Sequence, residues 1–316
     1  MATRDLELTG TAATPFSDWY DFPGGTARVS ATAFAPASLY MPDWFVVLPA
    51  VQGAGHRHPS TVVLLKHDPT GRLALFDLGI NSNWRDAIPA NEQAAYDLFD
   101  VKVEADLVDV LAAKGIKPDD ISTVILSHHH FDHVGDARQF PSAQFICGPD
   151  TRHKIRALDG HDNVLVLSWD ESSPRVATFE HSYDVWGDGS CVLVDASGHT
   201  SGHIAALLRT GGCEYVLAAA DCCHHPRLLA PDKGEEHYRL GKWREDGEPE
   251  EEAPRHSNYD DHALAEQTLE RVKSAHRRED VMVVLAHDFR QWEAWGPDKM
   301  ARRGVELNGW RSNGLK

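Results

Sequence analysis

The chain has 316 residues, of which 42% are hydrophobic and 25% are charged, and these proportions are ordinary for a soluble globular protein. Its formal net charge of −17 repels phosphate backbones, so nucleic acid is not expected as a substrate or partner. No apolar run reaches the roughly 18 residues of a membrane span, the first residues lack the pattern of a signal peptide, and five cysteines without a CxxC pair favour reduced thiols, so we expect a cytoplasmic protein.

Residues 1–60 combine many aromatic residues with proline and glycine. Residues 27–34 and 45–48 are predicted to be strands, and the whole segment is expected to be an N-terminal extension that packs near the site. Its aromatic residues suit a core, the wall of a substrate pocket or a dimer face, so a homodimer is one expectation. His56 and His58 lie in a loop flanked by glycine and proline and are expected to be solvated.

The chain then alternates between predicted strands and helices. Residues 61–66, 72–78 and 121–126 are rich in branched apolar residues and predict strands, and the second of these contains Asp77 in an Asp-x-Gly turn. The apolar spacing at residues 103–111 predicts a helix that ends at Gly115. Further strands are predicted at residues 144–147, 164–167, 175–179, 191–195, 204–208, 215–220 and 281–286, and further helices at residues 150–157 and 260–276. This order suggests an α/β layered domain.

The motif His-x-His-x-Asp-His directly follows the buried strand at residues 121–126. His128 and His130 are two residues apart on extended chain, so they point the same way and can bind one metal ion. Asp132 and His133 come after the chain has turned and can serve a second ion. The intervening histidine should point away and is not expected to be a ligand.

A second motif, Gly-His-Thr-x-Gly-His, follows the strand at residues 191–195 and carries His199 and His203. The strand at residues 215–220 ends in Asp221, whose two carboxylate oxygens can bridge two ions about 3.5–4 Å apart. Residues 224–258 are irregular and acidic, and either a lid near the site or a disordered insertion is consistent with them. The last predicted strand is followed by His287.

Taken in this order, the motifs resemble those of the metallo-β-lactamase superfamily over residues 62–287. The resemblance implies a single α/β (α+β) domain spanning residues 1–316, built as an αββα sandwich of two mixed β-sheets flanked by helices. It also implies Asp77 as a support for the metal loop, His203 as a residue outside the ligand set, and Asp221 as the bridge between two ions. The first ion would be held by His128, His130 and His199, and the second by Asp132, His133 and His287.

Histidine and carboxylate ligands without a thiolate suit two zinc ions best, and iron, manganese or cobalt can bind similar sites. Two cations that share a water lower its pKa to about 7, so the bridging hydroxide attacks a carbonyl carbon at neutral pH. Asp132 and Asp221 are therefore assigned to catalysis as well as to metal binding. The motif order is most similar to N-acyl-homoserine lactonases, which implies a dinuclear hydrolase (lactonase or lactamase) that opens a cyclic ester or amide in a small molecule.

Those lactonases often carry a tyrosine three residues after the bridging aspartate, whereas this chain has His224 there, followed by His225. His224 is therefore a candidate hydrogen-bond donor to the substrate or a candidate general acid to the leaving group. A plain loop histidine beside a metal site is equally consistent with the pattern. Cys222 and Cys223 flank the bridging position and are expected to lie outside the ligand set.

Two other functions fit the same motifs. A thioester hydrolase, either glyoxalase II-like or polyketide-releasing, is the main alternative, and the acidic region at residues 245–252 disfavours a glutathione conjugate as its substrate. A non-catalytic relative that keeps the fold as a binding module is the other, and a complete ligand set disfavours it. The motifs leave the natural substrate, the cleaved bond, the metal and the oligomeric state open.

Overall fold

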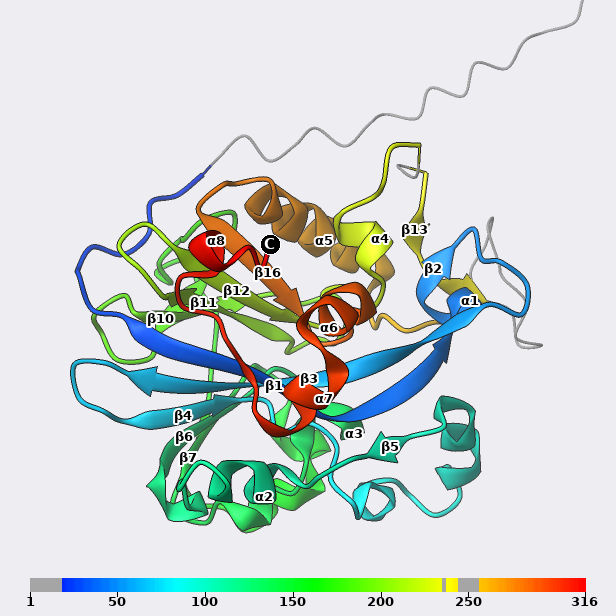
Figure 1. Cartoon of the computed structure of the whole chain (residues 1–316), viewed down its shortest axis with the longest axis horizontal. Coiled ribbons are helices and arrows are strands. Elements are labelled where there is room, and N and C mark those ends of the chain that lie inside the picture. The colour runs from blue at the N-terminus through cyan, green and yellow to red at the C-terminus, as the bar shows by residue number, and fades with distance from the viewer. Residues whose placement is uncertain (1–18, 235–236, 244–255) are drawn as a thin grey trace, which may run out of the picture.

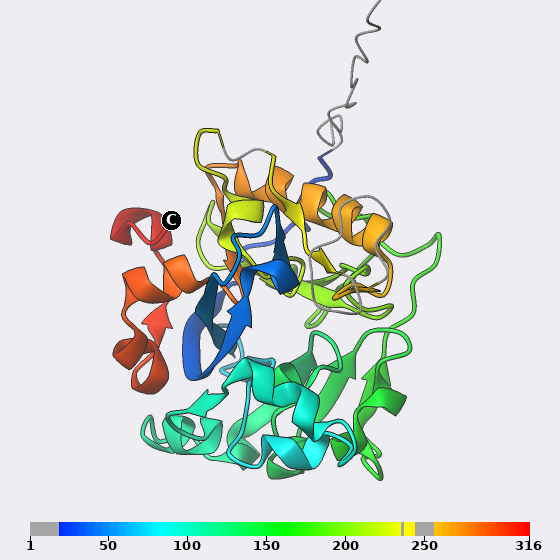
Figure 2. The ribbon, with the colours of Figure 1, turned by 90° about the vertical axis from the view of Figure 1, so that its right-hand side faces the viewer.

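The computed structural model describes residues 19–234, 237–243 and 256–316. Two β-sheets pack face to face with helices on their outer sides, and Figures 1 and 2 show this layered arrangement from two directions. The αββα sandwich predicted from the motifs is thus confirmed. The acidic residues 245–252 and the first 18 residues lie outside the described part of the chain.

The first sheet contains the longest strands of the described chain. Its order is β17 (Val305–Glu306), β1 (Val29–Pro42), β3 (Gly55–His67), β4 (Leu73–Phe76), β6 (Ile121–Leu126), β7 (Gln144–Cys147) and β8 (Val164–Val166), with β5 (Lys102–Val103) paired to β1. The strands from β17 to β4 are antiparallel, whereas β4, β6, β7 and β8 run parallel. The N-terminal segment therefore supplies a strand inside the sheet, and that strand is longer than the predicted one.

The second sheet is shorter and mostly antiparallel. Its order is β16 (Val281–Leu285), β12 (Tyr215–Ala220), β11 (Ile204–Arg209), β10 (Cys191–Asp195) and β9 (Ser182–Asp184). Only the β12–β16 pair is parallel in this sheet. Two small ribbons complete the described strands: β2 (Val47–Leu48) with β13 (Arg239–Leu240), and β14 (Lys242–Trp243) with β15 (His256–Ser257).

Helices cover both outer faces (Figure 1). They are α1 (Asp43–Val46), α2 (Leu107–Ala112), α3 (Phe131–Val134), α4 (Pro226–Leu229), α5 (His262–His276), α6 (Phe289–Trp295), α7 (Pro297–Arg302) and α8 (Trp310–Asn313). The longest, α5, begins where the Asp261 carboxylate accepts a hydrogen bond from the Leu264 N–H, as an N-cap does. None of the helices in the described ranges is long and apolar enough to cross a membrane.

One predicted helix is wrong. Residues 150–157 form two short 3-10 turns, Arg152–Lys154 and Arg156–Leu158, in place of a continuous α-helix. Ile155, between them, has φ −104° and ψ 93°, which are extended values that interrupt helical hydrogen bonding. The spacing of apolar residues does not report this break, because both Ile155 and Leu158 are still buried.

The strands bury alternate residues against different neighbours. In β10, Cys191 and Leu193 contact the core between the sheets, whereas Val192 and Val194 face the cluster that includes α5. This period of two is what a strand covered on both faces requires. The sheets are therefore rigid, and the loops at the ends of β6, β10, β12 and β16 start from fixed backbone.

Replacing Leu208 by Ala tests the inter-sheet core. Leu208 is fully buried in β11, so the substitution should lower the free energy of unfolding by about 2–5 kcal/mol, through lost burial and a residual cavity. Denaturant titration measures the change. Leu264→Ala is the matched control, because Leu264 is 37% exposed on α5 and its truncation should change stability by about 0.5 kcal/mol or less. Equal losses in the two variants would contradict this description of the core.

Candidate metal centre

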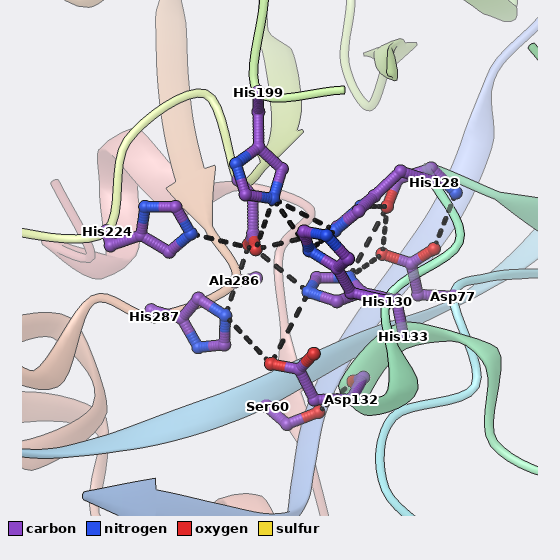
Figure 3. A network of polar contacts seen from close by, with 12 residues as sticks. Ser60, Asp77, His128, His130, Asp132, His133, His199, His224, Ala286 and His287 are labelled. Atoms are coloured by element: carbon purple, nitrogen blue, oxygen red, sulfur yellow. Dashed lines mark hydrogen bonds and ion pairs between the residues drawn. The ribbon is translucent and has the colours of Figure 1, made fainter. Parts of the chain in front are cut away.

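The structure brings all seven predicted ligands together from loops that follow strands and from α3, and Figure 3 labels six of them, all except Asp221. They form two groups whose candidate ligand atoms lie within 4.8 Å of one another. The first group is His128, His130, His199 and Asp221, and the second is Asp132, His133, Asp221 and His287. Asp221 belongs to both groups. The histidine between the first pair, His129, belongs to neither.

Three ring nitrogens of the first group form a compact triangle. His130 Nδ1 lies 3.0 Å from His128 Nε2 and 2.9 Å from His199 Nε2, and the remaining edge is 3.2 Å. Ligands of a tetrahedral zinc ion with bonds of 2.0–2.1 Å are separated by roughly 3.3 Å. Burial lowers the pKa of all three rings, that of His130 to about 3, so the imidazoles are neutral and their lone pairs are available to a cation.

The second group is rich in negative charge. His287 Nε2 lies 3.3 Å from Asp132 Oδ2 and 3.2 Å from Asp221 Oδ1, and His133 Nε2 lies 3.2 Å from Asp221 Oδ1. Burial acts to lower the pKa of His287, but the Asp221 and Asp132 carboxylates outweigh it and raise that pKa to about 10. The pKa of His133 is likewise raised, against burial, by Asp221, Asp77 and Asp132. Two buried carboxylates thus create a strong demand for positive charge, which a divalent cation can meet.

Asp221 connects the two groups through its two oxygens. Oδ1 faces His133 and His287, whereas Oδ2 lies 3.4 Å from His199 Nε2 and 3.6 Å from His128 Nε2. Oδ1 is buried without a hydrogen-bond partner, and so is His133 Nε2. Buried polar atoms without partners are rare. The donor set and these two atoms therefore fit a pair of divalent cations.

Neighbouring side chains fix the orientation of Asp221 and His133. The Asp221 backbone N–H donates to His203 Nε2 at 3.1 Å, and His203 Nδ1 donates to the Ala196 carbonyl. His203 therefore orients Asp221 from outside the two groups. Asp77 accepts from the Ser127 N–H at 2.7 Å and from His133 Nδ1 at 2.7 Å, which leaves His133 Nε2 facing the centre (Figure 3).

The expectation of a solvated loop is wrong for His58, whereas the His56 side chain is 38% exposed. Both belong to β3, where His58 is fully buried and its Nδ1 donates to the His287 carbonyl at 2.7 Å. His56 stacks on Phe289, with ring centroids 4.1 Å apart. Two histidines two residues apart on a strand share a face. That spacing was the signal available in the sequence, and the neighbouring glycine and proline obscured it.

His56 also lies in a third group of metal-capable residues, with Asp43 and His225. His225 Nδ1 accepts a hydrogen bond from the Arg227 N–H at 3.2 Å, so the ring carries its proton on Nε2. A protonated nitrogen cannot bind a metal ion, because its lone pair is occupied. We therefore interpret this group as a polar cluster that joins the end of β3 to α4, and not as a third metal centre.

A cavity of about 870 Å³ opens above the two groups. Its floor includes His130, Asp132, His199, Asp221, His224 and His287. Its apolar wall includes Leu39, Met41, Phe45, Ile88, Tyr96, Phe99 and Phe131. Charged residues of both signs lie around it: Asp86, Glu92, Asp136, Asp159, Asp260, Arg138, Lys154 and Arg156. Cys222 and Cys223 are buried nearby, but neither belongs to a metal-capable group.

Comparison with known proteins agrees with this geometry. The family model described as the metallo-beta-lactamase superfamily matches residues 56–149. The chain is 31% identical to the gamma-lactamase MBL2 of Gibberella moniliformis, over 48% of this chain and 70% of that protein. The chain belongs to the metallo-β-lactamase superfamily. It is a metal-dependent hydrolase of this superfamily, whose members bind divalent metal ions, typically two.

Other similar proteins show how far the similarity extends. The chain is 29% identical to the metallo-hydrolase mfmC of Annulohypoxylon moriforme, over 85% of this chain and 79% of that protein. It is 30% identical to the cytochrome P450 monooxygenase mpaDE of Penicillium brevicompactum over 69% of this chain, and it spans only 28% of that longer protein. A quorum-quenching N-acyl homoserine lactone lactonase shares the fold, with a TM-score of 0.61 at 19% identity, over 86% of this chain and 97% of that structure.

Replacing Asp77 by Asn tests the support of the metal loop. In Asp77 one carboxylate oxygen accepts from the Ser127 N–H, and the other accepts from the Ser127 hydroxyl and from His133 Nδ1. The amide of asparagine has an NH2 group in place of one oxygen and cannot accept all three bonds, so the His133 ring loses its fixed orientation. Zinc affinity should fall about 10–100-fold while the fold is retained. Competition with a chromophoric chelator measures the affinity. Asp97→Asn, which alters an exposed carboxylate paired with Arg85, should bind zinc as the wild type does, and unchanged affinity in Asp77→Asn would refute the role.

Proposed function

We propose that this hydrolase opens a cyclic ester or cyclic amide, a lactone or a lactam, in a small molecule with a substantial apolar part. The observation that carries the proposal is the shared carboxylate of Asp221 at the floor of a cavity of about 870 Å³ with an aromatic wall. A cavity of that size accommodates a drug-sized molecule. The names of two relatives, a gamma-lactamase and a lactonase, support this class of substrate.

The seven side chains have distinct tasks in this proposal. His128, His130 and His199 would hold one ion, and Asp132, His133 and His287 would hold the other, because Asp221 belongs to both groups. Zinc is the metal that these ligands suit best. Two such ions, when bound, supply a water that is acidic enough to act as a nucleophile at neutral pH and polarise the carbonyl that is attacked.

The remaining residues orient the substrate. Phe45, Tyr96, Phe99 and Phe131 form aromatic contacts among themselves, which gives the wall a fixed shape against which an apolar group can pack. Charges of both signs around the cavity favour a neutral substrate over a strongly anionic one. His224 lies at the floor, 3.1 Å from Asp221 Oδ2, where it can donate a hydrogen bond to the carbonyl under attack.

A panel of lactones, lactams, thioesters and phosphoesters tests the proposal. The zinc-loaded chain should show its highest kcat/KM with a lactone or lactam that carries an apolar substituent, because the wall contributes binding energy to that part. Treatment with a chelator should abolish the activity, and added zinc should restore it. Preferred hydrolysis of thioesters would instead favour the alternative function, and hydrolysis that persists in chelator would contradict a metal centre.

Replacing His224 by Ala removes the proposed donor. Turnover of the best substrate should fall roughly 100-fold, as expected for the loss of one donor to a developing oxyanion. The metal content, measured by mass spectrometry of the elements, should stay at the wild-type level, because His224 belongs to neither metal-capable group. The control is His153→Ala, since His153 is exposed. Turnover equal to that of the control would remove His224 from the mechanism.

A further inference from the structure

His224 and Tyr259 form a buried pair beside the shared carboxylate. The Tyr259 hydroxyl lies 3.0 Å from His224 Nδ1, and His224 Nε2 lies 3.1 Å from Asp221 Oδ2. Both residues are 4% exposed. The phenol, the imidazole and the carboxylate therefore form a chain of contacts that water does not interrupt, and Figure 3 shows the His224 ring pointing toward the centre.

The partners of His224 determine which of its nitrogens carries the proton. A neutral imidazole has one N–H and one lone pair, so its two nitrogens take opposite roles. A lone pair on Nε2 would face an oxygen of the Asp221 carboxylate, which is an acceptor only. A phenol can donate or accept, so Tyr259 is compatible with either role of Nδ1. The favourable arrangement has Nε2–H directed at Asp221 and the Tyr259 O–H donated to Nδ1.

We propose that Tyr259 is a positioning residue that fixes the orientation of the His224 ring by donating its O–H to Nδ1, so that the single Nε2–H is shared between Asp221 Oδ2 and the substrate carbonyl beside it. Because this donor belongs to the hydrolytic site proposed above, the role depends on that function. His224 lines the cavity and Tyr259 does not. Tyr259 therefore acts through His224 and does not contact the substrate.

The backbone around Tyr259 is fastened to the loop that carries His199. The Asp260 N–H donates to the His199 carbonyl at 3.0 Å, and the Asp261 N–H donates to the Gly198 carbonyl at 3.1 Å. Gly198 has φ +133°, and a Cβ at this position would collide with the first turn of α5. The segment from Tyr259 to the first turn of α5 thus lies against the loop that carries His199, and a side chain at position 198 would prevent this close approach.

The His224 ring is also confined on its other sides. It stacks against His287 with ring centroids 5.5 Å apart and an interplanar angle of 14°, and it lies 4.8 Å from the His199 ring. Rotation of the ring would break both hydrogen bonds. The family's tyrosine, which is expected three residues after the bridging aspartate, is thus replaced by two residues: a histidine at that position and a tyrosine that lies 35 positions further along the chain.

Nitrogen NMR of the zinc-loaded full chain, labelled with ¹⁵N-histidine, tests the tautomer without any substrate. The His224 ring is identified as the signal that disappears in His224→Ala. In the wild type we expect a protonated Nε2 and an unprotonated Nδ1 that accepts a hydrogen bond. In Tyr259→Phe we expect the Nδ1 signal to shift, because Nδ1 loses its donor, while Nε2 stays protonated toward Asp221. A metal-bound, unprotonated Nε2 would overturn the proposal and make His224 a further ligand. An unchanged Nδ1 signal in Tyr259→Phe would also overturn it.

A double-mutant cycle with the best substrate of the panel tests the consequence. Tyr259→Phe should lower kcat about tenfold, as expected for one hydrogen bond, with KM and metal content close to the wild-type values. In the His224→Ala background the same substitution should have no further effect, because Tyr259 acts only through His224. Equal losses in both backgrounds would show a merely structural role. Tyr215→Phe is the control, since Tyr215 stacks on Phe22 away from the centre.

The failure of this role can be told apart from the failure of the proposed function. If none of the panel is hydrolysed in a chelator-sensitive way, the function is refuted, and the NMR experiment still decides the tautomer. If lactones or lactams are hydrolysed but Tyr259→Phe has the wild-type kcat and the wild-type His224 Nδ1 signal, the hydrolase stands and the role of Tyr259 is refuted.

Discussion

The arrangement of the site depends on one buried carboxylate. Asp221 is 1% exposed, and His128, His133, His199, His224 and His287 all place a ring nitrogen within 3.1–3.6 Å of its oxygens. A carboxylate so far from water is strongly destabilising unless positive charge or donors compensate it. The loops that end β6, β10, β12 and β16 converge on this group, and under the proposed function two shared cations would satisfy both of its oxygens.

This convergence is accompanied by strained backbone at two positions. Ala220, which precedes Asp221, has φ 42°, and Asp77 has φ 61°, both of which are left-handed values that residues with a Cβ rarely adopt. Such strain persists only where the surroundings enforce it. Here Asp77 binds the backbone and side chain of Ser127 together with His133, and the Asp221 N–H is held by His203. The strained backbone thus lies directly before Asp221 and at Asp77, which holds Ser127 and His133 in place.

The sequence predicted which metal-capable side chains the fold brings together, because each one has a local signal. A buried strand ends, and a histidine or aspartate follows within one to four residues, as at His128, His199 and Asp221. Contacts between distant segments have no such signal. The hydrogen bond from His58 to the His287 carbonyl spans 229 positions, and Tyr259 reaches His224 across 35. The register of β1 with β3 and the packing of α5 against the His199 loop decide these contacts, and neither can be obtained from periodicity.

Anomalous diffraction at the zinc absorption edge, from crystals of the full chain grown with zinc, tests the central claim most directly. We expect two peaks about 3.5–4 Å apart, with one Asp221 oxygen at each. One peak should contact His128, His130 and His199, and the other Asp132, His133 and His287. A single peak, or two peaks of which Asp221 contacts only one, would contradict a centre built around a shared carboxylate.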